Sequence, residues 1–199
     1  INACPDKSTV YFPAGTYLVD PSIAFVIDSK NISFVGEGVT FDRRNRLYDR
    51  PNVYPTRTGK TTIKFKQVAS GTAENPITMF RFTDTQGIKP SVTIKNLTFD
   101  GADGVFIDLG NGSSSGPSFD QICNFTGAYC NGIDLSGLIQ AYLEDIQILG
   151  FSGTGLITGS WQLVNNVEIR LCGLGIEMRS SDTTIFQPFI HHCKNAINI

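Results

Sequence analysis

The chain has 199 residues, of which 41% are hydrophobic, which is enough for a single domain with a buried core. Its 16 Lys and Arg residues against 18 Asp and Glu residues give a formal net charge of −2, which argues against the basic stripe of a nucleic-acid-binding protein. No apolar run reaches the roughly 18 residues of a membrane span, and we expect any export signal to lie outside this chain.

Short runs of alternating apolar and polar residues follow one another along the chain, with the two-residue period of β-strands. The first half predicts strands at 9–12, 15–19, 23–27, 32–35, 61–68, 77–82, 92–99 and 105–109. The second half predicts strands at 138–143, 146–149, 155–158, 161–164, 167–171, 175–178, 184–186, 189–192 and 196–199. Segments at about 38–60 and 110–135 break the pattern, and we expect them to be loop insertions that border a binding surface.

The C-terminal part of the chain repeats with a fixed period of 21 residues. Residues 166–176 align without a gap with residues 187–197, and residues 145–150 fall into the same columns one period earlier. Similar phrases occur further upstream, at 96–101 and 31–36. A fixed period with strand-type alternation inside each repeat is typical of a solenoid.

The repeat length and alternation predict an all-β, parallel β-helix with turns of about 21 residues. Ile148, Ile169 and Ile190 should then stack in one inward column. A leucine-rich repeat is excluded, since its Leu-x-x-Leu-x-Leu frame is missing. Both ends of the chain lie in or beside strands, so we expect a single domain, 1–199, that is a fragment lacking its caps.

Asn and Asp residues recur where the chain turns into a strand. Asn31, Asn96, Asp145 and Asn166 are assigned to one repeat column, which predicts a stacked turn ladder. Asn31 and Asn96 also lie in formal glycosylation sequons, but the ladder explains them without sugar. Two further sequon residues, Asn111 and Asn124, are plausible acceptors only in a eukaryotic secretory protein.

The five cysteines indicate packing rather than metal binding. Cys172 and Cys193 are one period apart, so we expect them to stack as small apolar side chains inside the coil. Cys123 and Cys130 lie in one loop and could form a local disulfide in an oxidising compartment. No Cys-x-x-Cys is present, so neither a metal site nor a cofactor is predicted.

Two outward columns flank the inward isoleucines. They are Thr98/Gln147/Glu168/Phe189 and Asp100/Leu149/Arg170/His191. Glu168, Arg170 and His191 together suit acid/base chemistry on a sugar, with Arg170 pairing a uronate or sulfate, and we assign them as catalytic candidates. Gln147 and Asp100 are assigned to substrate binding. The alternative is a surface Glu–Arg ion pair beside a solvated histidine.

A second cluster follows from the same spacing, because Gln140, Trp161 and Asp182 are 21 residues apart. Trp161 is the only tryptophan and could form a platform for a sugar ring, with Asp182 as a hydroxyl acceptor or catalytic acid. The alternative is that Trp161 packs under the 110–135 insertion. We expect one groove between the two insertions, bordered by Trp161 and containing Asp182, Glu168 and Arg170.

The opening of the chain resembles a known family. The stretch 10–19, Val-Tyr-Phe-Pro-Ala-Gly-Thr-Tyr-Leu-Val, followed by Asn-Ile-Ser-Phe-Val-Gly-Glu-Gly at 31–38, is similar to the first coil of the pectate-lyase-like right-handed β-helix superfamily. The similarity is to the branch of rhamnogalacturonase/epimerase-like proteins, fungal β-1,3-glucanases and phage tailspike depolymerases. The catalytic phrases of polygalacturonases, mannuronan epimerases and pectate lyases are absent from the sequence.

The resemblance implies a protein that engages an extracellular polysaccharide, since this fold hosts lyases, hydrolases, epimerases and inert adhesins. Our first expectation is a polysaccharide-degrading enzyme of the tailspike depolymerase or secreted glycosidase/lyase type. The alternative is a non-catalytic virion spike or adhesin that binds a surface glycan. The resemblance also implies an extracellular or virion-surface location and, for tailspike relatives, a homotrimer of the full-length protein.

Overall fold

A computed structural model describes residues 3–20, 25–39, 60–66, 71–101, 104–105, 124–125, 129–191 and 193–199. All the regular secondary structure of these residues is β-strand. None of them forms a helix long and apolar enough to cross a bilayer. The strands, in chain order, are β1 (Ser8–Phe12), β2 (Gly15–Val19), β3 (Phe25–Asp28), β4 (Ile32–Gly36), β5 (Thr61–Phe65), β6 (Ile77–Thr83), β7 (Ser91–Lys95), β8 (Thr98–Asp100), β9 (Gly104–Val105), β10 (Asn124–Phe125), β11 (Cys130–Asp134), β12 (Gln140–Leu149), β13 (Thr154–Thr158), β14 (Gln162–Arg170), β15 (Leu174–Met178), β16 (Thr184–Phe186), β17 (Phe189–His191) and β18 (Asn195–Asn198).

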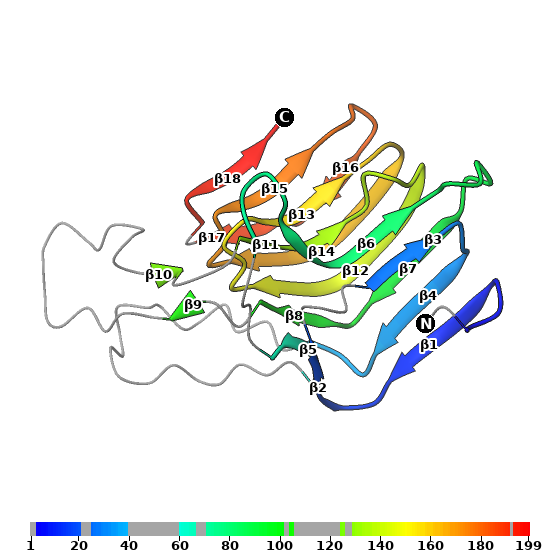
Figure 1. The fold of residues 1–199 in the computed structure, drawn as a ribbon, viewed down its shortest axis with the longest axis horizontal. Helices are drawn as coiled ribbons and strands as arrows, with labels where there is room; N and C mark the ends of the chain where they lie inside the picture. Colours follow the sequence, from blue (N-terminus) through cyan, green and yellow to red (C-terminus); the bar gives the residue numbers. More distant parts are fainter. Residues whose placement is uncertain are drawn as a thin grey trace, which may run out of the picture.

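The described strands, apart from the short antiparallel pair β9–β10, form three walls of a parallel coil (Figure 1). The first wall is β1, β4, β7, the first half of β12, the first half of β14 and β16. The second wall is β2, β5, β8, the second halves of β12 and β14, and β17. The third wall is β3, β6, β11, β13, β15 and β18. Each turn contributes one strand to each wall, which confirms the predicted parallel β-helix.

The inward columns form the core. Ile148 pairs in register with Ile169, and Ile169 with Ile190, so the predicted isoleucine column is confirmed. Phe34, Phe80 and other phenylalanines fill the coil further toward the N-terminus, with ring centroids of this pair 5.4 Å apart in an edge-to-face arrangement. Burying each such side chain stabilises the fold by roughly 1.5–3 kcal/mol. The core therefore runs along the coil axis as a stack of side chains from successive turns.

In each of the last four turns, the bend between the first and second walls is made by one residue in the left-handed backbone region. These residues are Asn96, Asp145, Asn166 and Gln187, with φ between 49° and 57°. Asn and Asp tolerate this conformation better than most residues. Asn166 Nδ2 donates a hydrogen bond to Asp145 Oδ1 at 2.5 Å, so the ladder is bonded between turns.

Asn31 does not belong to this ladder, and the prediction that aligned it with Asn96 is wrong. Ile32 pairs with Val92, which places Asn31 beside Ser91 at the start of the first wall. There Asn31 Oδ1 accepts a hydrogen bond from the backbone N–H of Ser91 at 2.9 Å. The phrase at 31–36 resembles the one at 96–101 because both enter a strand, but they enter strands of different walls.

Much of both predicted insertions, residues 40–59 and 106–123, lies outside the described residues. The predicted end of the second insertion at 135 is too late, because β11 is a strand of the third wall. Its Cys-Asn-Gly-Ile-Asp sequence lacks apolar alternation. Gly132 is required there, since a Cβ would lie 2.4 Å from the backbone oxygen of Gly155 on the next turn.

Replacing Asn166 by Ala should lower the free energy of unfolding by about 1–2 kcal/mol, because Ala strains in the left-handed backbone and the hydrogen bond to Asp145 is lost. Asn166→Gly loses the same hydrogen bond without that strain and should cost less. Urea unfolding of both variants beside the parent measures the difference. Equal losses would show that backbone conformation is not what this position requires.

Candidate functional site

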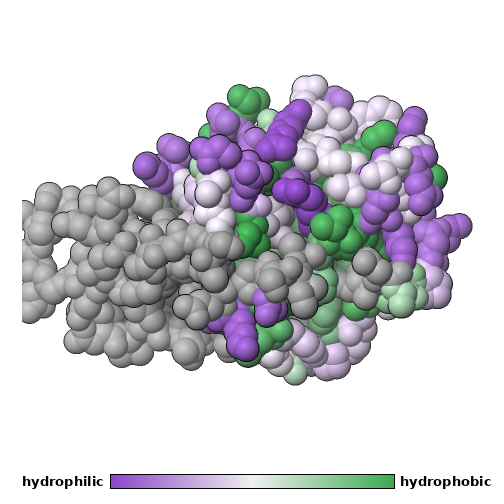
Figure 2. Space-filling view, viewed as in Figure 1, coloured by the Kyte–Doolittle hydropathy of each residue, from purple (hydrophilic) through white to green (hydrophobic). Residues whose placement is uncertain are grey.

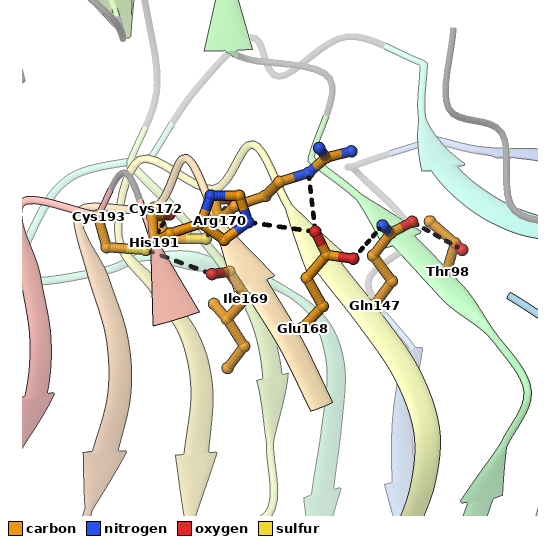
Figure 3. Close-up of polar contacts among 8 residues, drawn as sticks. All are labelled: Thr98, Gln147, Glu168, Ile169, Arg170, Cys172, His191 and Cys193. Carbon is orange, nitrogen blue, oxygen red and sulfur yellow. Dashed lines mark hydrogen bonds and ion pairs between the residues drawn. The ribbon is translucent and has the colours of Figure 1, made fainter. Parts of the chain in front are cut away.

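The outer side of the second wall carries a buried row of polar residues. Thr62, Thr98, Gln147 and Glu168 follow one another in register on successive turns, and each is at most 2% exposed. They point away from the core, as Figure 3 shows for Glu168 and the inward Ile169. The sequence predicts this column and its side, but the alternative of a solvated surface pair is wrong because Glu168 is only 1% exposed.

Hydrogen bonds link this row across three turns (Figure 3). Thr98 Oγ1 donates to Gln147 Oε1 at 3.3 Å, and Gln147 Nε2 donates to Glu168 Oε2 at 2.8 Å. The other carboxylate oxygen, Glu168 Oε1, lies 3.2 Å from His191 Nε2 and 3.9 Å from Arg170 Nε. The structure therefore brings together four of the predicted site residues, and we call Gln147, Glu168, Arg170 and His191 the carboxylate cluster.

Glu168 is ionised at neutral pH. Burial raises its pKa, but the hydrogen bond with His191, the charge of Arg170 and the hydrogen bond from Gln147 outweigh burial and hold the pKa below its ordinary value of 4.5. A carboxylate in this state accepts hydrogen bonds and stabilises a neighbouring cation. It does not donate a proton, so a general-acid role for Glu168 is disfavoured.

His191 and Arg170 reach the carboxylate from adjacent strands. They face each other in the β14–β17 register, two residue pairs beyond Glu168 and Phe189. The Phe189 ring lies 4.6 Å from the imidazole, centroid to centroid, at 40°. The side chain of Arg170 is 11% exposed and that of His191 is 24% exposed, so both border the outside while Glu168 does not.

Asp100 lies outside the carboxylate cluster. Its Oδ2 pairs with Lys64 Nζ at 2.9 Å, on the neighbouring turn of the second wall. In the register of this column, Leu149 separates Asp100 from Arg170. The predicted substrate-binding role of Asp100 stays a prediction, and the residue lies on the same wall as Arg170, two turns away.

Two cysteines adjoin the cluster at the end of the second wall (Figure 3). Cys172 is buried and Cys193 packs against the core, as the period predicts. The hydrogen bond with the Cys172 side chain lowers the pKa of Cys193, and burial acts in the opposite direction. Cys123, the predicted partner of Cys130, lies outside the described residues, so that disulfide stays a prediction.

Trp161 and Asp182 meet at the start of the first wall's last two strands. The indole Nε1 donates a hydrogen bond to Asp182 Oδ2 at 3.2 Å. Trp161 is 64% exposed, so the alternative that it is buried under the second insertion is wrong. Two other carboxylates, Glu177 and Asp145, are bonded to Arg179 and Asn166.

The structure places Trp161 and Glu168 on different walls. They are seven residues apart along the chain, which is about 23 Å of extended strand, and the bend at Asn166 lies between them. Trp161 borders the first wall, whereas Glu168 belongs to the second. The predicted single groove lies between the two insertions, most of whose residues are outside the described ones, so that groove stays a prediction.

Comparison with known families identifies one match. A family model described as rhamnogalacturonase A/epimerase, pectate lyase-like, matches residues 1–198. Comparison with curated proteins found no match, and comparison with solved structures found none either. Within the part of the chain that the structure describes, no three His, Cys, Asp or Glu side chains gather as metal ligands would.

The lowered pKa of Glu168 predicts how stability depends on pH. Its contribution is fully present above the ordinary, unfolded-state pKa of 4.5 and is lost as the pH falls through the lower folded-state value. Glu168→Gln should therefore have a shallower loss of stability in this acid range than the parent. Thermal unfolding followed from neutral pH to pH 3 measures this.

Asp28 supplies the control for this prediction, because hydrogen bonds from the Thr85 hydroxyl, the Thr85 backbone and Thr83 lower its pKa to about 2. Asp28→Asn should also reduce the loss of stability at acid pH, and its effect should be independent of Glu168, since the two residues lie on different walls. If the parent and Glu168→Gln lose stability equally between neutral pH and pH 3, Glu168 is not ionised in the folded protein.

Proposed function

Because this chain belongs to the rhamnogalacturonase A/epimerase, pectate lyase-like family, we propose that it binds an extracellular polysaccharide and cleaves it at the carboxylate cluster. The observation that carries the proposal is a buried, ionised glutamate held between an imidazole and a guanidinium on the outer side of a coil wall. Stability does not call for this arrangement, because buried ion pairs are often no more stable than apolar residues of similar volume.

The cluster divides the chemistry among three side chains. Glu168 contacts the imidazole at Nε2 and orients it for proton transfer. His191, which borders the outside, is the group that transfers the proton. Arg170 supplies a guanidinium that pairs with a sugar carboxylate or a developing oxyanion.

These roles favour elimination over hydrolysis. Glycoside hydrolysis by two carboxyl groups places them about 5–5.5 or 6.5–9.5 Å apart. The described residues that contact Glu168 are an amide, a guanidinium and an imidazole, and the last two supply the carboxylate partner and the base that an elimination uses. In an elimination, His191 would take the proton from the carbon that carries a uronate carboxylate paired with Arg170. The electron pair of the broken C–H bond forms a C=C bond. The glycosidic C–O bond breaks with its electron pair on the leaving oxygen, which takes a proton from the imidazolium or from water.

Attachment without cleavage is a second candidate function. The observation that favours it is the exposed Trp161, which lies apart from the carboxylate cluster and next to a hydroxyl acceptor, Asp182. A virion spike or adhesin would need such a surface and no proton transfer. A homotrimer of the full-length protein belongs to the tailspike or virion-spike form of these proposals, and an extracellular or virion-surface location belongs to both.

Replacing His191 by Ala should lower the cleavage rate by about 10²–10⁴, the usual contribution of positioned proton transfer. Glu168→Gln should lower it too, because the amide cannot stabilise the imidazolium. The assay incubates the protein with uronate-containing and neutral polysaccharides and follows the absorbance of unsaturated uronates together with reducing ends.

Glu177→Gln is the matched control, because that carboxylate forms an ion pair with Arg179 on the third wall, away from the cluster. It should retain the parent rate. Reducing ends without unsaturated product would contradict elimination. Binding without any cleavage across the panel would favour the attachment function, and full activity in His191→Ala would exclude the proposed base.

A further inference from the structure

The outer side of the first wall carries a group of exposed apolar and aromatic side chains near its C-terminal turns. Trp161 is 64% exposed, Phe186 is 55% exposed and Leu163 is 36% exposed. They lie on the outer side because the residues that alternate with them, such as Val164, are buried in the core. Tyr142 pairs in register with Leu163 and extends the group by one turn. We call Trp161, Tyr142, Leu163 and Phe186 the aromatic surface.

The aromatic surface is interspersed with polar groups rather than continuous. Figure 2 shows the same mixture on the face that it displays, where hydrophobic residues lie in separate groups among hydrophilic ones. Register places Asn165 beside Phe186, and Thr184 beside Leu163. Rings and hydrogen-bonding groups therefore alternate over a few ångströms, which suits a ligand with apolar faces and many hydroxyls.

The charges on this wall favour a neutral ligand. Lys95 Nζ lies 2.8 Å from Glu144 Oε2 and 4.7 Å from the centre of the Tyr142 ring, so this cation is already engaged. The hydrogen bond from Lys95 also lowers the pKa of Glu144, which keeps it ionised. Asp182, beside Trp161, adds a carboxylate that accepts hydroxyl hydrogen bonds but repels an anionic sugar.

The position of the indole is fixed. Trp161 has a φ of 51°, an unusual backbone conformation for a bulky side chain, and its Nε1 is bonded to Asp182 on the next turn. Phe186 is one strand across and four residues further along the wall, about 14 Å away by strand geometry. The two rings therefore mark the ends of a surface longer than one sugar ring.

We infer that the aromatic surface is a second glycan-binding site, which takes a stretch of neutral sugars and is separate from the carboxylate cluster. The inference rests on the proposed function only in taking a polysaccharide as the ligand. The two sites share strand β14 but lie on different walls, on either side of the bend at Asn166. One part of a polysaccharide chain could thus be bound on the first wall while another part of the same chain contacts the carboxylate cluster.

The only tryptophan of the chain reports directly on this site. Titration with neutral oligosaccharides of glucose, mannose and xylose units should shift the Trp161 emission to the blue and protect it from acrylamide quenching, whereas oligogalacturonate should not. Affinity electrophoresis in gels containing the matching neutral polysaccharide should show a dissociation constant raised about tenfold or more by Trp161→Ala and several-fold by Phe186→Ala.

Val26→Ala is the matched control, because Val26 is also an exposed apolar residue, 47% exposed, but lies on the third wall. It should change affinity by less than twofold. Equal weakening by Val26→Ala, or no emission change with any neutral sugar, would overturn the inference. So would an emission shift that follows protein concentration without sugar, since the surface would then be an interface between copies of this chain.

Glu168→Gln separates this inference from the proposed function. The emission response should be intact in that variant, and its loss would mean that the two surfaces form one site, which overturns the inference. A response to neutral sugars without cleavage of any polysaccharide would leave the second site standing and remove the catalytic proposal. Cleavage of a polysaccharide without any emission response to neutral sugars would support the catalytic proposal and overturn the second site.

Discussion

Parallel hydrogen bonding between successive turns sets a spacing on which the core and both surfaces depend. Neighbouring strands lie about 4.8 Å apart, so a side chain meets its counterpart one turn away. Inside the coil this spacing stacks Ile148 on Ile169. Outside the coil it brings Gln147 within 2.8 Å of Glu168 and the Trp161 indole within 3.2 Å of Asp182. The core and both surfaces are thus columns of one lattice.

Because the lattice has a fixed period, much of it could be predicted from the sequence. The 21-residue spacing places Arg170 beside His191, and the structure has this pairing. The same spacing links Trp161 to Asp182, which are hydrogen bonded. These predictions were possible because a column needs only the period and the alternation of apolar residues. Neither depends on the residues between the strands.

Burial, walls and irregular turns could not be predicted in this way. Alternation tells which side of a strand Glu168 occupies, but an outward side chain can be exposed or covered, and this one is 1% exposed. Asn31 matches the sequence motif of the Asn/Asp ladder, yet it starts a strand of the first wall. The motif marks the start of a strand but does not specify the wall to which that strand belongs. β11 was missed, since its fit depends on the close approach of Gly132 to Gly155 rather than on apolar residues.

The bend at Asn166 is what gives one strand two different surfaces. With φ of 52° it turns β14 between walls, so residues before it face one direction and residues after it face another. Before the bend, Leu163 and the adjoining Trp161 are exposed; after it, Glu168 is buried and charged. Apolar stacking needs open area, and a stabilised ion cluster needs exclusion of water. A bent strand provides both an open surface and a water-excluded one within a single turn of the coil. Residues of either surface can therefore be substituted without disturbing the inward columns of the core.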